Sequence, residues 1–589
     1  MDIYEGLESE SYDRCYKDSI LLKRIFKYFR AYRGKVILIV LFVIIATVFE
    51  IAVPIIISKV VDVFTMKNDN NLVIMMCCGL IIIGILKFTG KYLEKFLSST
   101  VVGNVVLNLR TQLYSKVLGM ELSFFDTQST GKIVNRIMND TTGFANVITL
   151  IIELFSYLLI IICLSVWLAF ISLQLTLLLV GMMFLAIIIS LSFRFVARRY
   201  SRYSRQSAAN ISSIFQESIN GIMTAKIFRQ ESVIYNNFIN SNKQYYRINV
   251  RLGLLYCVIY PMIAIFSGAG LAVLVYAGSK LYQSGDISTG AWLLFIQSEA
   301  YFWYPMMKIA SFWSMFQEGI ACSERIFSLL DTEKTVKQTN RIQLNESISK
   351  FEFKDVTFFY DGREDLFRKF NLTVHSGEKM ALVGHTGSGK TTLLKLLARY
   401  NEFQEGTILV NGTDIRKLDL DQYRRKLGII SQNPYLFSGT VKENILYGND
   451  SAADEDLWYV ITNISDGEWL DDFSNGLETD VGECGGMVSS GQQQLISLAR
   501  IMLKNPDVLI LDEATANIDP FTEAQIQDGL KKLMKNRTVI MVAHRISTLN
   551  FADRITVLDH GSIIEQGTQE ELIKKDGLYR KLHSKFYEI

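Results

Sequence analysis

Long runs of apolar residues dominate the first half of the sequence. Six of them are each near the roughly 20 residues that a helix needs to cross a bilayer. They cover residues 35–57, 72–96, 147–170, 173–193, 255–282 and 291–312. A helix satisfies its own backbone hydrogen bonds inside lipid, so the runs predict six membrane-spanning helices. The composition agrees, since 49% of the residues are hydrophobic and 20% are charged.

The distribution of basic residues predicts the orientation of these helices. The segment between the fourth and fifth runs is rich in Arg and Lys, whereas residues 171–174, between the third and fourth runs, contain neither. Because basic loops stay inside the cell, the basic segment is cytoplasmic, and alternation places both termini and residues 98–145 there too. A basic amphipathic segment, residues 21–35, is expected to lie on the inner membrane surface. The acidic, polar N-terminus excludes a secretory signal peptide.

The two cytoplasmic segments between the runs are too long to be turns. They are polar, helix-favouring and poor in Gly and Pro, so the spanning helices are expected to continue into the cytoplasm. Each segment contains a Gly among short polar residues, at 123–140 and at 216–231, which predicts a turn and a short crossing helix. The seven cysteines show no metal-ligand spacing and are expected to be inert buried thiols.

From about residue 349 the sequence takes on the pattern of an α/β domain. Short β-branched strands such as KMALV (379–383) and DVLILD (507–512) alternate with helical segments. The first strand leads into a phosphate-binding motif: Gly384, His385, Thr386, Gly387, Ser388, Gly389, Lys390, Thr391 and Thr392. Its glycines let backbone N–H groups surround phosphate oxygens, Lys390 supplies a charge, and Thr391 offers a hydroxyl to Mg²⁺.

Further chemistry-bearing residues stand at the ends of other predicted strands. Asp512 ends DVLILD and is expected near Mg²⁺, and Glu513 is expected to activate the attacking water. The alternative for this pair is a solvated helix cap. Gln432 follows the strand LGII and is a candidate for Mg²⁺ and the water, and His544 follows VIMVA and is a candidate for the γ-phosphate. Tyr360 is either a platform for the adenine ring or an ordinary strand aromatic.

Taken together, these motifs resemble those of ATP-binding cassette exporters of the half-transporter type, over nearly the whole chain. The resemblance implies an adenine-stacking Tyr360, a Walker A loop at 384–392, a Q-loop Gln432, a signature at 488–492, a Walker B motif ending at Asp512 with catalytic Glu513, a D-loop Asp519 and a switch His544. Residues 479–485 resemble the segment before the signature in exporters, and 123–140 and 216–231 resemble coupling helices. The implied cofactors are ATP and Mg²⁺, with Thr391, Gln432 and Asp512 as the metal-binding residues.

The expected fold is therefore an α-helical membrane domain of six transmembrane helices with long cytoplasmic extensions, fused to an α/β P-loop nucleotide-binding domain. The expected divisions are an N-terminal cytoplasmic segment at 1–34, a transmembrane domain at 35–316, a linker at 317–348 and an ATP-binding cassette at 349–589. We expect a multi-pass protein of the cell membrane with its cassette in the cytoplasm, and no nucleic-acid partner.

The signature departs from the Leu-Ser-Gly-Gly-Gln of the family. This chain has Val488, Ser489, Ser490, Gly491 and Gln492. In the family, two cassettes dimerise head to tail and each ATP lies between the Walker motifs of one and the signature of the other. A side chain at Ser490 is expected to narrow the approach of the backbone and to restrict its φ/ψ choice, which weakens that site. Since Glu513 is intact, the pattern favours a heterodimer with one competent and one slow site over a homodimer that tolerates serine.

Charged residues within the apolar runs are candidates for a substrate site. They are Glu50, Glu153, Glu299 and Lys308. A stripe of the last helix combines one carboxylate with apolar groups: Phe295, Glu299, Phe302 and Met306. The stripe suits an amphipathic or cationic substrate, or else simple packing between helices. Drug, lipid and peptide export all remain open, as does an ATP-gated channel or regulatory protein without pumping.

Overall fold

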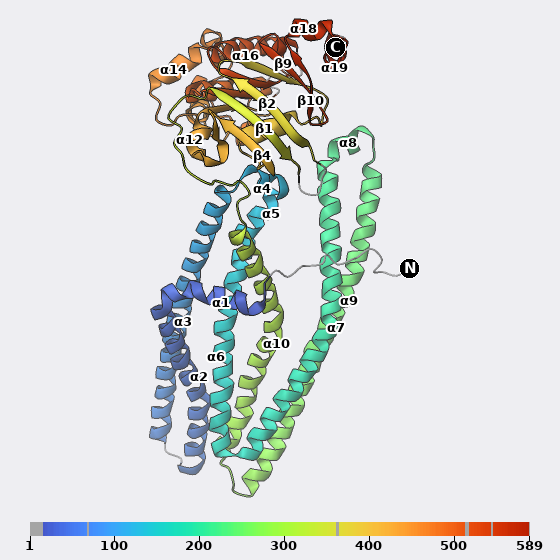
Figure 1. Ribbon diagram of the computed structural model, residues 1–589. Coiled ribbons are helices and arrows are strands. Elements are labelled where there is room, and N and C mark those ends of the chain that lie inside the picture. The colour runs from blue at the N-terminus through green and yellow to red at the C-terminus, as the bar shows by residue number, and fades with distance from the viewer. Residues whose placement is uncertain (1–15, 68–69, 361–364, 513–517, 544–545, 588–589) are drawn as a thin grey trace. The chain divides into compact units, whose positions relative to one another are not determined.

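The computed structural model describes residues 16–67, 70–360, 365–512, 518–543 and 546–587 (Figure 1). Within this part of the chain two compact units are present. The membrane unit comprises Met1–Gly119 and Ser129–Thr332, and the cassette unit comprises Met120–Gln128 and Glu333–Ile589. The cassette unit therefore includes a short piece of the chain from between the second and third apolar runs.

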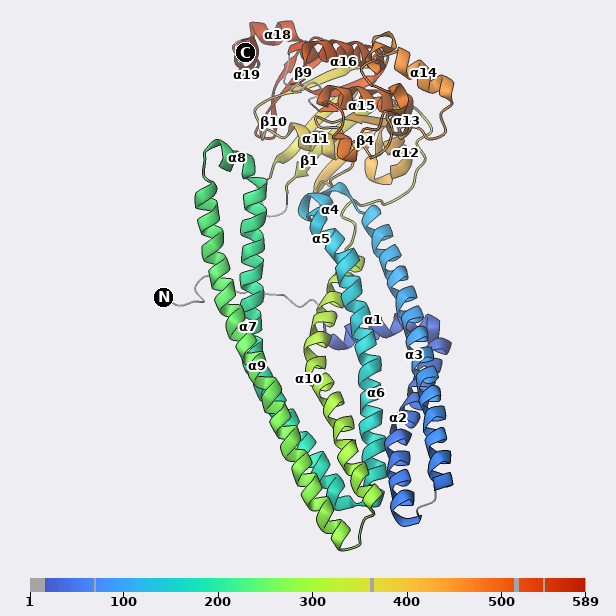
Figure 2. The ribbon, with the colours of Figure 1, turned by 180° about the vertical axis from the view of Figure 1, so that it is seen from behind.

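The membrane unit is built of long helices joined by a few short ones (Figure 2). They are α1 (Asp18–Phe29), α2 (Arg33–Lys67), α3 (Asn70–Leu118), α5 (Thr130–Asn135), α6 (Thr141–Ile171), α7 (Leu173–Asn220), α8 (Ile222–Ile227), α9 (Glu231–Gln283) and α10 (Thr289–Asp331). Among the described residues, five helical stretches are long and apolar enough to cross a membrane, and they correspond to the first five runs. The sixth run lies in α10, where several side chains fall outside the described residues.

Helices α7 and α9 are among those of the membrane unit that extend far beyond the membrane-spanning length. Helix α7 has 48 residues and α9 has 53, against the roughly 20 that a bilayer requires. They run side by side and are joined at their far end by the short helix α8 (Figures 1 and 2). The expected cytoplasmic extension with a short crossing helix is thus observed at this point of the chain.

Helices α6 and α10 pack closely near the cytoplasmic side of the membrane unit. The guanidinium of Arg325 donates two hydrogen bonds to the buried carboxylate of Asp140, at 2.8 and 2.5 Å. A Cβ atom added to Gly143 would lie only 2.6 Å from Sγ of Cys322, so glycine is required for this approach. Burial is the main reason that the pKa of the Cys322 thiol rises to about 11, and the nearby Asp140 carboxylate raises it further.

The cassette unit contains two β-sheets. The four-stranded sheet has the order β2-β1-β4-β5, and the six-stranded sheet has the order β10-β9-β3-β8-β7-β6. The strands are β1 (Lys350–Phe358), β2 (Phe367–His375), β3 (Lys379–Val383), β4 (Glu405–Val410), β5 (Thr413–Asp414), β6 (Leu427–Ile430), β7 (Val508–Asp512), β8 (Thr538–Val542), β9 (Arg554–Asp559) and β10 (Ser562–Gly567). The central strands β3, β8, β7 and β6 are parallel and nearly fully buried, which explains their continuous apolar sequences.

The cassette unit contains ten α-helices among the described residues, and all except α4 follow one of its strands along the chain. They are α4 (Leu122–Thr127), α11 (Lys390–Leu397), α12 (Leu420–Arg425), α13 (Val441–Leu446), α14 (Asp454–Thr462), α15 (Ser490–Lys504), α16 (Pro520–Leu533), α17 (Ile546–Leu549), α18 (Gln569–Lys574) and α19 (Leu578–Tyr587). A short helix was expected in the segment 123–140. Helix α4 lies at the start of this segment and begins one residue before it, at Leu122. Helical segments and parallel strands alternate along the chain as the sequence predicts.

The connection between the units differs from the expected linker at 317–348. Helix α10 continues to Asp331, so the first part of that segment is helical. The reason is that Ile320, Phe327 and other apolar side chains at helical spacing are buried there.

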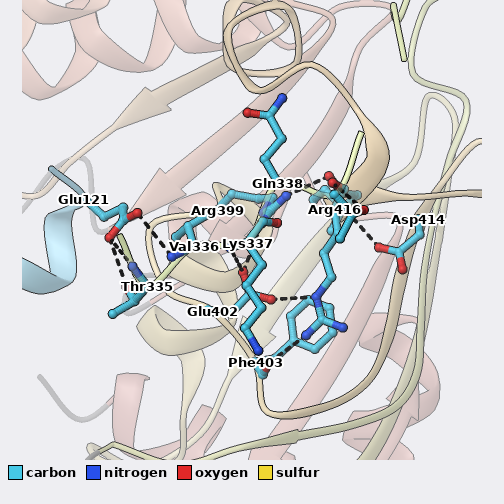
Figure 3. A network of polar contacts seen from close by, with 12 residues as sticks. Glu121, Thr335, Val336, Lys337, Gln338, Arg399, Glu402, Phe403, Asp414 and Arg416 are labelled. Carbon is cyan, nitrogen blue, oxygen red and sulfur yellow. Dashed lines mark hydrogen bonds and ion pairs between the residues drawn. The ribbon is translucent and has the colours of Figure 1, made fainter. Parts of the chain in front are cut away.

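Beyond α10, the connecting residues are held by a network of polar contacts inside the cassette unit (Figure 3). The carboxylate of Glu121 accepts hydrogen bonds from the N–H groups of Thr335 and Val336, at 2.9 and 3.1 Å, and from the Thr335 hydroxyl at 3.0 Å. A second carboxylate, Glu402, accepts from the N–H of Lys337 at 2.9 Å. The linker thus follows a defined path across the cassette.

Candidate functional site

The phosphate-binding motif forms a tight loop between β3 and α11. Gly389 has a φ of +105°, a conformation that glycine adopts without strain. A Cβ atom at Gly384 would lie 2.1 Å from the carbonyl oxygen of Leu558, so no larger residue fits there either. The ammonium of Lys390 donates to the carbonyl oxygens of Gly384 and His385, at 2.8 and 3.0 Å. The loop is therefore curled around the lysine head group as a phosphate cradle requires.

Two observations show that this loop fits a nucleotide phosphate. The hydroxyl of Ser388 is buried and makes no hydrogen bond with any described residue. A buried hydroxyl without a partner is costly, and a phosphate oxygen is a suitable acceptor for it. The loop also leads directly into helix α11, whose N-terminus favours the binding of negative charge.

Tyr360 lies beside the cradle. Its hydroxyl is 3.1 Å from Oγ1 of Thr392, and its ring packs edge-on against Phe358 with 4.9 Å between the centroids. The side chain is only partly buried, and Tyr360 lies two residues after the end of β1, so it is not a strand residue. This placement is compatible with an adenine platform and with simple packing against Phe358.

The other predicted residues gather at the same edge of the six-stranded sheet. Asp512 ends β7, and Gln432 follows β6, the parallel neighbour of β7. Strand β8 lies between β3 and β7, so the carboxyl ends of these strands bring Asp512 and the phosphate loop to one side of the sheet. Ligands of open α/β sheets bind at this edge. The predicted Glu513 and His544 lie outside the described residues.

The arrangement suits Mg²⁺ bound together with a nucleotide. No cluster of three or more His, Cys, Asp or Glu side chains able to hold a metal occurs among the described residues. The hydroxyl of Thr391 is exposed at the start of α11, and Asp512 is partly buried at the end of its strand. A hydroxyl and one or two carboxylates, completed by phosphate oxygens, are the ligands that Mg²⁺ prefers. Bound there, the ion would neutralise phosphate charge.

The altered signature forms the N-terminus of α15. Ser489 is the N-cap residue: its hydroxyl accepts from the N–H of Gln492 at 3.2 Å, and the Gln492 side chain accepts from the N–H of Ser489 at 2.9 Å. Ser490 is the first helical residue and is not among the residues with positive φ. Serine adopts helical dihedrals readily, so the expected restriction of its φ/ψ choice causes no backbone strain at Ser490.

Glycine is needed one position later in the signature. A Cβ atom at Gly491 would lie 2.6 Å from Cγ2 of Thr522, where α15 packs against α16. Asp519 is the N-cap residue of α16 and accepts from the N–H of Thr522 at 2.9 Å. That backbone hydrogen bond lowers the pKa of the Asp519 carboxyl. The two helix starts thus pack against each other on the cassette.

Known protein families match parts of both units of the chain. Residues 36–306 match the ABC transporter transmembrane region, and residues 367–516 match the ABC transporter family. The chain is 34% identical, over 95% of its length and 93% of the relative's, to the uncharacterized ABC transporter ATP-binding protein YknV of Bacillus subtilis. The chain belongs to the ABC transporter family. As an ABC transporter it is a multi-pass membrane protein that couples ATP hydrolysis to translocation, with its cassette in the cytoplasm.

Two other similar proteins have more specific names. The ATP-dependent lipid A-core flippase of Salmonella typhimurium is 32% identical, over 88% of this transporter and 89% of the flippase. A bacterial Atm1-family ABC exporter solved with ATP bound has a TM-score of 0.75 and 23% identity, over 94% of this chain and 98% of that one. The second likeness concerns the fold.

The membrane unit of the transporter has a cavity at part of the predicted substrate stripe. The cavity, of about 250 Å³, lies between α7, α9 and α10 and is lined mainly by apolar side chains. Glu299 and Phe302 line it, and the Ser267 hydroxyl donates to the Glu299 carboxylate at 2.5 Å. Phe295 does not line it, because it is fully buried in the helix core. The side chain of Met306 lies outside the described residues.

Sequence reasoning missed the partners of the other membrane carboxylates. Lys87 of α3 lies 3.2 Å from Glu50 of α2, and Lys95 of α3 lies 2.9 Å from Glu153 of α6. Lys87, Lys91 and Lys95 recur every four residues, and this spacing was the signal that one face of α3 is basic. Glu50 and Glu153 are thereby paired between helices.

Proposed function

We propose that this ABC transporter exports a hydrophobic or amphipathic substrate by alternating access, as one subunit of a heterodimer with one competent and one slow ATP site. The observation that carries the heterodimer is Ser490 at the N-terminus of α15, in a chain that retains Glu513. The competent site consists of this chain's Walker motifs and the signature of the partner. The slow site consists of this chain's signature and the partner's Walker motifs.

The position of Ser490 supports the proposal of a weakened signature. Its side chain is exposed at the end of the helix, so it lies where the γ-phosphate of a facing nucleotide would approach. The effect is steric and not conformational, since the backbone is helical there. A nucleotide drives the two cassettes together only to the extent that it binds the closed pair more tightly than the open one. A greater distance between the γ-phosphate and the N-terminus of α15 reduces this difference in affinity.

ATPase measurements on the purified subunit, alone and with its co-purified partner, test the heterodimer. We expect low activity alone, high activity in the pair, and a rise for the lone subunit on Ser490→Gly. Ser490→Ala is the matched control, because it removes the hydroxyl and keeps the Cβ atom. Full ATPase activity of the lone subunit that Ser490→Gly does not raise would show that the two sites are equal.

The assignment of Glu513 as the catalytic base has its own test. Glu513→Gln in the pair should trap ATP and abolish turnover while ATP binding persists. Normal turnover of that variant would contradict the role given to Glu513.

The tip of the α7–α9 hairpin supports the presence of a second chain. The side chains of Met223, Ile227 and Phe228, in or next to α8, are 75%, 70% and 68% exposed. The tip belongs to the cytoplasmic extension, where lipid cannot cover these groups, and clustered exposed apolar groups mark protein interaction sites. We infer that the partner's cassette covers this tip.

Substituting the tip tests this contact. Met223→Asp with Ile227→Asp should break the pair on size-exclusion chromatography and abolish ATPase stimulation by the partner. Glu231→Gln, at the start of α9, is a control for a polar change beside the tip. A pair that stays intact and fully active with both aspartates would exclude the tip as an interface.

The cavity around Glu299 supports an amphipathic or cationic substrate. The Ser267 hydroxyl meets one oxygen of this carboxylate, but a negative charge surrounded by apolar side chains within the membrane unit remains costly unless a cation meets it as well. We expect cationic amphiphiles to stimulate the ATPase of the pair. In Glu299→Gln, the concentration that gives half-maximal stimulation should rise about tenfold. For neutral amphiphiles the half-maximal concentration should change less than threefold. An equal rise for cationic and neutral amphiphiles would show that the charge of Glu299 does not select the substrate.

A homodimeric lipid flippase is the second candidate, because a lipid A-core flippase is among the relatives at 32% identity. Reconstituted single subunits that move a fluorescent lipid between leaflets on ATP would favour it. ATP-gated conductance without uphill flux would instead favour the channel alternative.

A further inference from the structure

A second cavity of the membrane unit lies beneath the N-terminal helix. It has a volume of about 270 Å³ and is enclosed by α1, the start of α2, α3 and α6. We call it the α1 cavity. Its floor is formed by Ile39, Val43 and Val101, which are at most 4% exposed. Ser98 is the one polar residue among those that line it, so the cavity suits a hydrocarbon and not a water-soluble ligand.

The rim of the α1 cavity is continuous with the surface that faces lipid. Phe26, Val40 and Phe155 line the cavity and are nevertheless 60%, 38% and 41% exposed. Just beside them on α2, Ile37 is 67% exposed, as a lipid-facing side chain must be. An occupant therefore enters sideways from the bilayer. Since the cavity adjoins the first turns of α2 and the N-terminus is cytoplasmic, that side is the inner leaflet.

The chain around the cavity is strongly basic. Residues 19–35 contain no Asp or Glu. Five exposed cations occur there, and none of them forms an ion pair within the part of the chain that the structure describes: Lys23, Lys27, Arg30, Arg33 and Lys35. The sixth, Arg24, is held by Asp331 of α10, which fixes α1 against the bundle. A basic cluster directly cytoplasmic of a spanning helix attracts anionic lipid head groups.

We propose that the α1 cavity binds one acyl chain of an anionic phospholipid of the inner leaflet, with its phosphate held by the basic residues at the α1–α2 junction. Arg30 and Arg33 flank that junction, immediately before Val36, the first residue of α2 that lines the cavity. Arginine suits a phosphate because its guanidinium donates two parallel hydrogen bonds. The hydrocarbon fills the apolar space, and the charge selects the head group.

Photo-crosslinking of the full chain in nanodiscs tests the proposal. The probe is phosphatidylglycerol with a diazirine in one acyl chain, and the matched probe is phosphatidylcholine with the same chain. We expect phosphatidylglycerol to label peptides covering 36–43 and 98–102 at least fivefold more strongly than phosphatidylcholine does. Excess unlabelled phosphatidylglycerol should compete, and excess phosphatidylcholine should not.

Three variants separate the cavity from the general lipid surface. Val43→Trp fills the floor and should reduce labelling at least fivefold. Ile37→Trp, on the exposed side of the same helix, should leave it unchanged. Arg30→Gln with Arg33→Gln should remove the preference for phosphatidylglycerol, and this surface variant tests the proposal even if Val43→Trp fails to fold. Equal labelling by the two lipids in the wild-type chain, or wild-type labelling of a folded Val43→Trp, would overturn the proposal.

Discussion

Replacing Glu121 by Gln should loosen the linker from the cassette by a measurable amount. Glu121 is 8% exposed, and its carboxylate accepts three hydrogen bonds, two from Thr335 at one oxygen and one from Val336 at the other. Hydrogen bonds to a charged group each contribute about 1.5–3 kcal/mol. Glutamine keeps one acceptor oxygen and turns an amide N–H₂ toward the other donor. We therefore expect a loss of about 2 kcal/mol, since one charged bond disappears and the others become neutral.

Hydrogen exchange of the full-length chain measures this loss locally. A free-energy change of about 2 kcal/mol corresponds to about 30-fold faster exchange at the amides of the linker. The matched control is Glu333→Gln, which removes an exposed carboxylate from the same segment. Exchange of the linker peptide within twofold of wild type in Glu121→Gln, or an equal increase in Glu333→Gln, would refute the reasoning.

Three further perturbations have defined outcomes. Because burial raises the pKa of Cys322 to about 11, its thiol stays protonated at pH 8, and its alkylation should accelerate about tenfold per pH unit toward pH 11. Cys484 is exposed, contrary to the expectation of buried thiols, and should be alkylated faster than Cys322 at pH 8; equal rates at pH 8 would contradict this. Glu402→Gln leaves two arginines without the charge that lies 3.0 and 2.6 Å from them, so denaturant unfolding should show the cassette destabilised by about 3 kcal/mol. Gly491→Ala should lower stability by about 1–3 kcal/mol through overpacking against α16, whereas Ser490→Ala should change it by less than about 0.5 kcal/mol; similar values for both would remove the distinction.

The membrane helices and the phosphate loop were predictable because their signals are local. A run of apolar residues and a glycine-rich loop after a strand each carry their physical reason within about 20 residues. The short helices α4 and α8 were located for the same reason, since Gly among polar residues interrupts a helical pattern.

Pairings between distant residues could not be predicted in this way. The contact of Glu121 with Thr335, and those of Lys87 and Lys95 with carboxylates on other helices, depend on how the helices and loops pack. The continuation of α10 to Asp331 was missed because its apolar positions are interspersed with polar ones. At Ser490 the residue type suggested a backbone restriction, but the dihedral angles depend on where α15 begins.

The hydrogen bonds between Glu121 and the linker also affect the order in which the protein folds during synthesis. Its partners Thr335 and Val336 leave the ribosome more than two hundred residues later, so this part of the cassette waits unfinished until most of the membrane unit has been synthesised. A cassette cut from the chain at its linker would lack residues 120–128 and would expose two amides that the intact protein satisfies. Residues 333–589 therefore do not contain the whole cassette unit. Its complete folding also requires residues 120–128, which are synthesised directly after α2 and α3.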